Sequence, residues 1–598
     1  MSDYRSPVAD ALFTLRHIGE LEQLASTELY AHADLDTVTS VLEEQGRFMQ
    51  EVFGPSNAIG DREGLKWSPE GVETPQAFKD AYAEFVEAGW QGLNAHVEYG
   101  GAGFPEAVFA CAAEFMTAAN GALTMCPGLT TGAIECLQEW GTEEQKEVYL
   151  RKLVTGEWTG TMNLTEPHAG SDVGLSTTKA VPAGDGTYRI TGTKIFISFG
   201  EHDMAENIIH LVLARLPEAP AGTKGISLFI VPKFLVNEDG SLGERNDVKC
   251  VSIEHKMGIH ASPTCVLSYG DEGGAVGYLV GEEHRGMRAM FTMMNSARIA
   301  VGIQGVALGA AAYQKALTYS QERVQGSEIG SDSKGPVPII AHPDVRRMLL
   351  SMKSSIEAMR ALVVYNAAAI DFSRALEGDE AESWREIAEL LTPVTKAWCT
   401  DLGLEVTSTA VQVFGGMGYI EESGVSQHFR DARIAPIYEG TNGIQAMDLV
   451  GRKLGQDGGE SARVLIAEMK EALPALTRLL PGKPAERLAA GIEAVEDATL
   501  WMLDQKTDPN AAADVLAGAD AYLRLMGDVV GGWLLARGAI AAWSKLETEG
   551  ADRAWLQGRI DLYEAYAANV LGHCTARLAA VGQGGDLLRR IGAEALAG

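Results

Sequence analysis

The amino-acid sequence predicts a multidomain α+β protein: an N-terminal helical domain, a central antiparallel β-barrel or sandwich domain, a helical bundle domain and an extra C-terminal helical domain. The first observation is length, because 598 residues are far more than one hydrophobic core usually serves. The second is the appearance of short β-branched runs near Gly160. The third is the return of long alanine-rich stretches at Met287. We expect the four domains to span residues 1–159, 160–282, 283–455 and 456–598.

The N-terminal part shows the apolar spacing of helices. Phe78, Tyr82 and Phe85 recur at intervals of four and three, which places them on one helical face. Beyond residue 160, runs such as Ile208–Leu213 and Ile226–Val231 are separated by glycine, proline and asparagine, as in a β domain. No long helical pattern lies between these runs, so the sequence argues against a doubly wound α/β domain.

Helical patterns dominate again in the second half of the chain. The stretch Met287–Arg323 contains no proline, and its alanines and glycines would let neighbouring helices approach closely in a bundle. Further helices are predicted up to about Leu376 and over residues 383–414. A glycine-rich linker at 455–459 precedes the last helical part, where apolar residues recur at spacings of three and four: Leu523, Met526, Val530 and Trp533.

The composition excludes several classes of protein. With 49 basic and 81 acidic residues the formal net charge is −32, which argues against nucleic acid and anionic membrane surfaces as partners. The seven cysteines form no C-x-x-C pair, so neither a metal site nor a disulfide framework is predicted, and we expect buried reduced thiols. No signal peptide is visible and no apolar run approaches the ~20 residues of a membrane span. A cytoplasmic protein is expected.

Four groups of residues stand out, and together they resemble the acyl-CoA dehydrogenase family. They are Leu164–Asp172 (LTEPHAGSD), Lys194–Ser198 (KIFIS), Arg323–Gly326 with Val411–Tyr419 (RVQG and VQVFGGMGY), and Arg430–Gln445 (RDARIAPIYEGTNGIQ). Each match is modest evidence, but four in the family's order make chance implausible. The resemblance covers roughly three quarters of the chain and implies an FAD-dependent enzyme that acts on acyl-CoA thioesters.

The resemblance implies a cofactor role for the first segment and the residues just before it. Met162, Leu164 and Thr165 would lie against the flavin, whose reduced ring needs backbone donors and a hydroxyl near its edge. Gly170 and Ser171 would approach the cofactor phosphates, and Ser171 also the substrate. The alternative for this short motif alone is a capped surface turn.

The second segment supplies an aromatic ring and a hydroxyl. Phe196 stands where the family commonly has tryptophan beside the flavin, and Ser198 corresponds to a hydroxyl near flavin N5. Without the first segment, an aromatic residue in a strand would more often belong to the core.

The third pair of segments implies an oligomer. In the family they reach the FAD of a neighbouring subunit: Arg323 and Gln325 from one segment, Gln412 and Gly416 from the other. The planar fork of arginine suits a diphosphate, and glycines let the backbone approach a nucleotide. A homodimer or a dimer of dimers is therefore implied. Alternatively, Arg323 could be a solvated charge and the glycine run a simple helix stop.

The fourth segment carries the proposed catalytic base, Glu439. A thioester α-proton is weakly acidic, so a carboxylate must approach it in a dry pocket that raises its basicity. In the family the base's backbone N–H and a ribityl hydroxyl bind the thioester oxygen, and the β-hydrogen leaves as hydride to the flavin. Gly440 and Arg298 would contact substrate and Thr441 the cofactor, whereas Gly443 stands where many relatives have glutamine. Taken singly, Glu439 could be an ordinary loop carboxylate and Arg298 part of an ion pair.

The segments before and after these motifs exceed a minimal dehydrogenase. This length resembles the branch that converts 3-methylmercaptopropionyl-CoA to methylthioacryloyl-CoA in dimethylsulfoniopropionate degradation. An electron-transfer flavoprotein or similar acceptor would take the electrons. Three alternatives remain open: a general short- or medium-chain acyl-CoA dehydrogenase, an acyl-CoA oxidase, and a catalytically silent flavin-containing relative that binds nucleic acid. A structural helical scaffold would lack flavin altogether.

Overall fold

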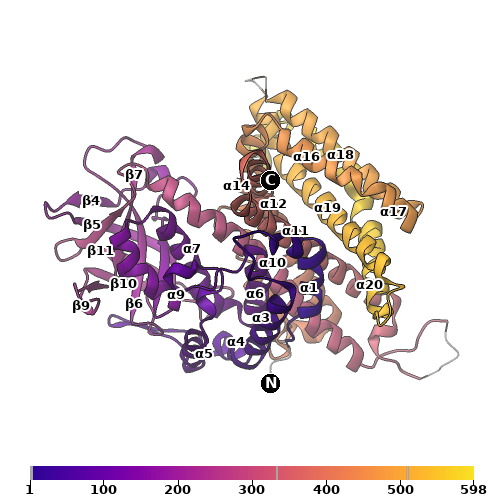
Figure 1. Ribbon diagram of the computed structural model, residues 1–598, viewed down its shortest axis with the longest axis horizontal. Helices are drawn as coiled ribbons and strands as arrows, with labels where there is room; N and C mark the ends of the chain where they lie inside the picture. The colour runs from indigo at the N-terminus through magenta and orange to yellow at the C-terminus, as the bar shows by residue number, and fades with distance from the viewer. Residues whose placement is uncertain (1–3, 331–334, 507, 509–510, 583, 598) are drawn as a thin grey trace. The chain divides into compact units, whose positions relative to one another are not determined.

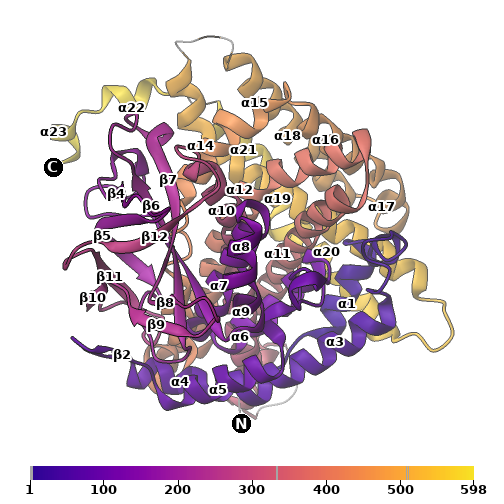
Figure 2. The same ribbon diagram turned by 60° about the vertical axis from the view of Figure 1, so that its left-hand side comes forward.

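The computed structural model describes residues 4–330, 335–506, 508, 511–582 and 584–597 (Figures 1 and 2). The chain forms two compact units. Unit 1 comprises residues 1–6, 45–104 and 119–300, and unit 2 comprises residues 7–44, 105–118 and 301–598. Helices and strands follow the predicted order of helices, strands and further helices, which confirms the multidomain α+β class. The division into four domains stays a prediction.

Unit 1 combines a strand-rich body with short helices. Its helices are α4 (Gly54–Glu63), α5 (Gln76–Glu87), α7 (Gly121–Trp140), α8 (Glu143–Gln145) and α9 (Arg151–Thr155). Its strands are β1 (Lys66–Ser68), β2 (Gly71–Glu73), β3 (Trp158–Asn163), β4 (Lys179–Pro182), β5 (Tyr188–Ser198), β6 (Asn207–Arg215), β7 (Ile226–Pro232), β8 (Phe234–Val236), β9 (Leu242–Arg245), β10 (Val248–Ile253), β11 (Thr264–Tyr269) and β12 (Ala275–Val280). The predicted face of α5 is confirmed, since Phe78, Tyr82 and Phe85 are buried.

The main sheet of unit 1 closes on itself. Strand β5 pairs with β4 and β12, β12 with β7, and β7 with β6, while Arg215 of β6 pairs back with Lys179 of β4. Strands β11 and β10 continue the sheet from β5. An antiparallel barrel or sandwich was predicted, and most strand pairs are antiparallel. Strand β3, however, runs parallel to β6, because the long chain between them can return in either direction. The hairpin of β1 and β2, in a region predicted as mainly helical, was not foreseen.

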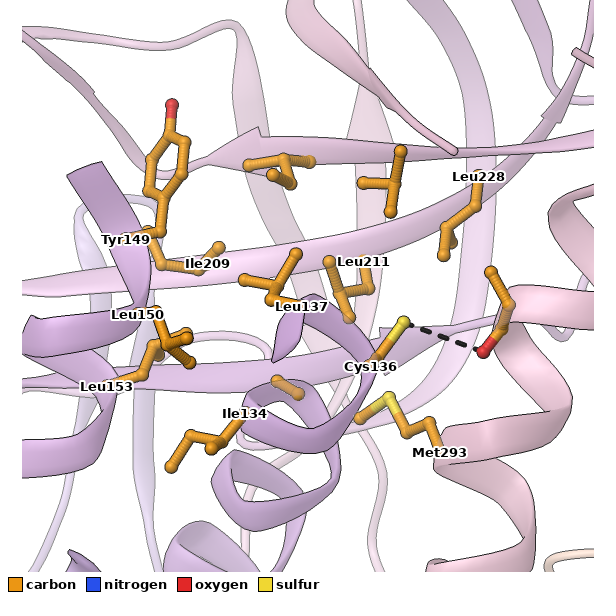
Figure 3. Packing of buried hydrophobic residues seen from close by; sticks show 14 of the residues in the cluster. Ile134, Cys136, Leu137, Tyr149, Leu150, Leu153, Ile209, Leu211, Leu228 and Met293 are labelled. Carbon is orange, nitrogen blue, oxygen red and sulfur yellow. Dashed lines mark hydrogen bonds between the residues drawn. The ribbon is translucent and has the colours of Figure 1, made fainter. Parts of the chain in front are cut away.

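Helices α7 and α9 lie beside the sheet (Figure 2), and a hydrophobic core packs between them (Figure 3). Ile134 and Leu137 of α7 belong to this core together with Ile209 and Leu211 of β6, and Met293 packs against it from α10 (Gly286–Glu322). The dashed line in Figure 3 marks the Cys136 thiol, which donates to the carbonyl of Ala289 over 3.5 Å. All seven cysteines are free and buried, which confirms the prediction for these thiols.

Unit 2 is built from helices. They are α1 (Val8–His17), α2 (Leu21–Leu24), α6 (Glu106–Ala119), α11 (Pro343–Ala375), α12 (Gly378–Phe414), α13 (Val425–Ala432), α14 (Asn442–Asp448), α15 (Leu454–Gln456), α16 (Glu460–Glu471), α17 (Leu473–Leu479), α18 (Lys483–Gln505), α19 (Ala512–Lys545), α20 (Arg553–Asn569), α21 (Cys574–Val581), α22 (Asp586–Arg590) and α23 (Ala593–Leu596). Helices α3 (Leu35–Phe48) and α10 have residues in both units, and the last residue of α6, Ala119, belongs to unit 1.

Small residues let α10 and α12 approach closely, as predicted. A Cβ on Gly305 would lie 2.2 Å from the carbonyl oxygen of Cys399, and a Cβ on Gly403 would lie 2.4 Å from that of Gly305. Real Cβ atoms do not tolerate such contacts, so the packing of the two helices requires glycine at both positions.

A six-residue ion network joins four helices of unit 2: Asp10 of α1, Glu114 of α6, Lys353, Glu357 and Arg360 of α11, and Arg559 of α20. Arg559 contacts Asp10 at 2.6 Å and Glu357 at 2.8 Å. Burial would raise the pKa of Glu357, but the neighbouring cations hold it well below its ordinary value. Three positive and three negative side chains balance, so the network fixes α1 and the C-terminal α20 to the bundle without a net buried charge.

Helix α19 passes the length and composition test for a membrane span, although charged residues interrupt its apolar sequence. Its most apolar window has a mean hydropathy of 1.3, yet 78% of that window is buried inside the protein. The predicted face of Leu523, Met526, Val530 and Trp533 is buried. A mostly buried helix of this kind is typical of a protein core, so it is weak evidence for a span.

Candidate active site

Glu166 fixes the loop that follows β3 in unit 1. Its carboxylate accepts hydrogen bonds of 2.6 to 3.0 Å from the backbone N–H and hydroxyl groups of Thr177 and Thr178. The Lys194 ammonium lies 2.9 Å from this carboxylate and donates over 2.9 Å to the carbonyl of Leu164. Burial favours a raised pKa for Glu166, but Lys194 and the hydrogen bonds lower it to about 2. Burial lowers the pKa of Lys194 to about 8, so both groups are charged at neutral pH.

The residues predicted to face the flavin differ in exposure. Met162 is only 7% exposed and its side chain packs into the core of unit 1. Leu164 and Thr165 are half-buried, and Gly170 and Ser171 are exposed. A Cβ on Gly170 would meet no atom within 4 Å, so the backbone there is open to a ligand. This segment therefore leads from the core to an accessible backbone, and Met162 can contribute through packing beneath it.

Phe196 is held in an unusual conformation beside this loop. Its φ is +60° and its side chain is 58% exposed, at a register shift between β5 and β11. The neighbouring N–H of Ile195 donates over 2.9 Å to the carbonyl of Thr165, which couples β5 to the loop. Ser198, two residues further, is half-buried. An exposed aromatic ring on a strained backbone is typical of a functional site rather than a core position.

Arg298 lies in the unit 1 part of α10 and is only 4% exposed. Other α10 side chains bind α7: Thr292 donates over 3.0 Å to Glu139, and Ser296 donates to Glu135. Arg298 is therefore a buried charge on a helix anchored by its neighbours, not a solvated one, and its contact with substrate stays a prediction.

In unit 2, Glu439 lies on a loop with two consecutive left-handed residues. Glu439 has φ +56° and Gly440 has φ +82°, and both are half-buried. The side-chain amide of Gln445 donates to the carbonyls of Glu439 and Gly440, over 3.2 and 3.1 Å. Thr441 caps α14, since its hydroxyl accepts the N–H of Ile444 over 3.3 Å. The loop backbone is thus shaped by the first turn of the helix that follows it.

Two further anchors hold the same loop to the bundle. The Tyr438 hydroxyl donates to the side-chain oxygen of Gln304 on α10, and burial raises the pKa of Tyr438 well above its usual range. Asn442 donates over 2.8 Å to Asp401 on α12 and accepts from the ammonium of Lys396 over 2.8 Å. A base that must meet one carbon atom needs such rigid support.

Arg323 and Gln325 belong to a small hairpin after α10. The Gln325 N–H donates to Val337 over 3.0 Å, and the Arg323 carbonyl accepts the N–H of Ile339 over 2.8 Å. Both side chains are exposed, and Gly326, which follows Gln325, has φ +71°. The hairpin presents an exposed guanidinium, as binding of a phosphate would require.

The glycine-rich segment after α12 is also exposed. Gln412 and Gly416 face solvent, and a Cβ on Gly416 would meet no atom within 4 Å. Tyr419 is 89% exposed, an unusual state for a large side chain. A Cβ on Gly418 would lie 2.3 Å from the carbonyl of Val411, so this glycine allows the tight 3-10 turn.

The structure gathers the predicted residues into two groups. Within unit 1, β3, the loop after it and β5 carry Met162, Leu164, Thr165, Gly170, Ser171, Phe196 and Ser198, and α10 carries Arg298. Within unit 2, the loop before α14 carries Glu439, Gly440 and Thr441, and the hairpin and glycine segments carry Arg323, Gln325, Gln412 and Gly416. Among the described residues, no three His, Cys, Asp or Glu side chains gather as a metal would need.

Comparison with known protein families identifies the chain along most of its length. Four domain models match in order: acyl-CoA dehydrogenase N-terminal domain over residues 43–157, middle domain over 161–271, C-terminal domain over 284–454, and acetyl-CoA dehydrogenase C-terminal like over 465–591. The chain belongs to the acyl-CoA dehydrogenase family. It is accordingly an oxidoreductase that acts on CH–CH bonds, as predicted.

Several relatives resemble this acyl-CoA dehydrogenase over nearly its whole length. The 3-methylmercaptopropionyl-CoA dehydrogenase of Ruegeria pomeroyi is 46% identical over 98% of this chain and 99% of its own. The broad-specificity linear acyl-CoA dehydrogenase FadE5 of Mycobacterium tuberculosis is 35% identical, covering 96% of each chain. The structure of ACDH-11 of Caenorhabditis elegans in complex with C11-CoA aligns with TM-score 0.74 and 21% identity, over 95% of this chain and 92% of that one. The fold and the C-terminal extension are therefore shared with known proteins.

Members of the family depend on FAD, and the dehydrogenase uses this cofactor, as predicted. The acyl-CoA dehydrogenase of Bacillus anthracis, solved in complex with FAD, aligns with TM-score 0.67 and 22% identity, over 92% of this chain and 87% of its own. The residues present fit the cofactor. Phe196 exposes a flat apolar ring, and the backbone at Gly170 and Gly416 is open to close approach.

Sequence inspection missed the residues that support the site. The roles of Glu166 and Lys194 depend on a pairing between β5 and a distant loop, which no local pattern reveals. Gln304 lies in a stretch whose pattern predicted only a helix of the bundle. Gln445 was detectable in principle, because it lies four residues after the helix cap Thr441 and its side chain returns toward that end of α14.

Proposed function

We propose that this dehydrogenase oxidises 3-methylmercaptopropionyl-CoA to methylthioacryloyl-CoA with Glu439 as the catalytic base. The observation that carries the proposal is 46% identity, over essentially the whole of both chains, to an enzyme named for that substrate. The loop around Glu439 supports the base assignment, because strain and several tethers fix the backbone of a half-buried residue that carries a carboxylate.

The reaction removes one proton and one hydride from adjacent carbons. Glu439 takes the proton from the carbon next to the thioester carbonyl, and its backbone N–H donates to the carbonyl oxygen as negative charge develops there. Bound FAD supplies the acceptor for the hydride that leaves the β-carbon. The sulfur on that carbon donates electron density as the hydride leaves, so no additional catalytic residue is needed.

The remaining predicted residues bind and orient the reactants. Leu164, Thr165 and Phe196 form the wall for the flavin, and Ser198 offers a hydroxyl near its reactive nitrogen. Gly440 and Ser171 contact the substrate with backbone and hydroxyl groups. Arg298 adds the buried positive charge at the CoA or thioester end.

The exposed segments of unit 2 serve a second subunit in this proposal. Arg323 and Gln325 from the hairpin, with Gln412 and Gly416 from the glycine segment, bind FAD of a neighbouring copy. Gly170 and Thr441 contact FAD within their own subunit, and Met162 packs beneath the loop that binds it. The exposed side chains of Met417 and Tyr419 support this proposal, because an interface would cover them. The assembly is a homodimer or a dimer of dimers in the cytoplasm, with an electron-transfer flavoprotein or similar acceptor as redox partner.

A substrate panel tests the proposal. Purified protein with FAD and an artificial electron acceptor is assayed with the methylthio thioester and with straight-chain acyl-CoA thioesters of increasing length. The proposal expects the highest kcat/KM for the methylthio substrate, and a higher value for straight chains would contradict it. Glu439→Gln should retain FAD and lose about 100- to 10,000-fold in kcat, the usual contribution of a general base.

A broad-specificity linear acyl-CoA dehydrogenase is the second candidate. It is favoured by 35% identity over 96% of both chains to an enzyme of that description. The same panel separates the two, because a broad enzyme would show similar kcat/KM across chain lengths. The oxidase alternative is tested by repeating the assay in air without the artificial electron acceptor. An oxidase would then form hydrogen peroxide at the rate of turnover.

A further inference from the structure

The loop that carries Glu439 adopts a backbone conformation that a glutamate does not choose by itself. Its φ of +56° lies in the left-handed region, and Gly440 follows with φ +82°. A side chain with a Cβ is strained there, so the surrounding structure must stabilise this conformation. Any group that does so also determines where the Glu439 side chain and N–H point.

Gln445 is such a group. It lies on α14 with 0% exposure, and its Nε2 donates to the carbonyls of Glu439 and Gly440, over 3.2 and 3.1 Å. These two carbonyls belong to the peptides on either side of Gly440, so a single amide fixes the orientation of both. The backbone N–H of Gln445 also donates over 3.0 Å to the carbonyl of Thr441.

The orientation of the Gln445 amide follows from its surroundings. A flipped amide would turn its oxygen toward two carbonyl oxygens and lose both hydrogen bonds, so Nε2 faces the loop. The oxygen Oε1 is buried and has no hydrogen-bond partner among the described residues. The two donations to the loop therefore hold this amide.

Gly440 is shaped to receive it. A Cβ at this position would lie 2.7 Å from Nε2 of Gln445, so glycine allows the amide to come close. The other anchors, Tyr438 and Asn442, hold side chains before and after the base. Gln445 instead holds the carbonyl of Glu439 itself.

We propose that Gln445 is a positioning residue for the reaction: its carboxamide locks the two peptides around Gly440 and thereby maintains the strained backbone angles of Glu439, on which the directions of its carboxylate and N–H depend. This inference rests on the proposed role of Glu439. Loss of the lock would let these peptides rotate, and a displacement of about 1 Å in a reacting group can cost on the order of 100-fold in rate.

The main variant is Gln445→Met, which preserves length and removes both donors. Its kcat should fall about 10- to 100-fold while KM changes by less than about 3-fold, because the base is misplaced and substrate contacts persist. The FAD content should match wild type. Incorporation of solvent deuterium at the α-carbon of the substrate, measured without acceptor by mass spectrometry, should slow by the same factor as kcat.

A matched control is Gln91→Met in unit 1. Gln91 is also buried, and its Nε2 donates to two oxygens, those of Pro127 over 3.2 Å and Thr131 over 3.1 Å. It should lose comparable thermal stability but keep kcat within about 2-fold. If both variants lower kcat and α-proton exchange equally, Gln445 has only a general structural role and the proposal fails.

Gln445→Glu provides a second test that does not depend on how the Met variant folds. A carboxylate would face two carbonyl oxygens and stand near Glu439, so the pH midpoint of kcat should rise by roughly one unit. An unshifted profile with normal kcat overturns the proposal. Failure of the proposed function can be told apart from failure of the positioning role. If Glu439→Gln stays active, Glu439 is not the base and the proposed function itself is refuted. If Glu439→Gln is inactive but Gln445→Met has normal activity, only the positioning role of Gln445 is refuted.

Discussion

Replacing Arg559 by methionine tests whether the ion network fixes the C-terminal helices to the bundle. Arg559 binds Asp10 over 2.6 Å and Glu357 over 2.8 Å, and its side chain is only 10% exposed. The network holds three cations and three anions, so the variant leaves one buried negative charge uncompensated. Breaking a buried ion pair in this way costs about 3 to 5 kcal/mol. Methionine retains the packing of the arginine methylene groups, so this cost reports the lost charge.

The measurement is equilibrium unfolding in urea, followed by circular dichroism. With a slope of about 3 kcal/mol per molar urea, the midpoint of the transition that includes α20 should fall by about 1 to 2 M. Arg553→Ala is the control on the same helix, because Arg553 pairs with Glu547 at 3.2 Å with both side chains more than two-thirds exposed. That change should cost less than about 1 kcal/mol.

Removing the charge of Asp10 in the Arg559→Met background should restore part of the stability, since the network is balanced again. The reasoning is refuted if Arg559→Met unfolds at the same urea concentration as Arg553→Ala. It is also refuted if Asp10→Asn adds its full cost to that of Arg559→Met, because independent sites would add.

Three further outcomes are expected. Gly403→Ala should destabilise unit 2 by about 1 to 3 kcal/mol or more, because its Cβ would lie 2.4 Å from a backbone oxygen. The control Gly558→Ala in α20 meets no atom within 4 Å and should stabilise the protein by up to about 1 kcal/mol. Equal shifts of the thermal midpoint in the two variants would contradict this reasoning. Burial lowers the pKa of His210 from 6.5 to about 3, so the stability that the neutral imidazole contributes is complete above pH 6.5 and is lost as pH falls toward 3. The free energy of unfolding, measured by denaturation across this range, should fall by a few kcal/mol, and less steeply in His210→Asn. Lys194→Met should leave Glu166 buried without its cation, costing about 3 to 5 kcal/mol and weakening FAD retention measured by absorbance; full retention would show that the loop does not need this pair.

The sequence predicted features that depend on local pattern. The proline-free stretch from Met287 became α10, and the spacing of Phe78, Tyr82 and Phe85 gave the buried face of α5. Helices are built from neighbours along the chain, so periodicity alone suffices for them. The motif around Glu439 was visible for the same reason, because its residues are contiguous.

Features built from distant residues were not predictable. Asp10, Glu114 and Arg559 each read as an ordinary helix charge, and only the fold brings them to the same place. The parallel direction of β3 against β6 depends on how a long intervening chain returns. The left-handed conformations of Phe196 and Glu439 were hidden as well, since neither residue type favours them and tertiary contacts impose the strain.

Because Arg559 completes the charge balance around Asp10 and Glu357, the C-terminal helices behave as part of the bundle rather than as an appendage. Ending the chain near residue 455 would remove the cation that pairs with two buried carboxylates. The remaining part of the protein would have to admit water to these carboxylates or protonate them. A shortened enzyme of ordinary family length therefore cannot be made from this protein by deletion alone. The carboxylates on α1 and α11 would have to be redesigned at the same time.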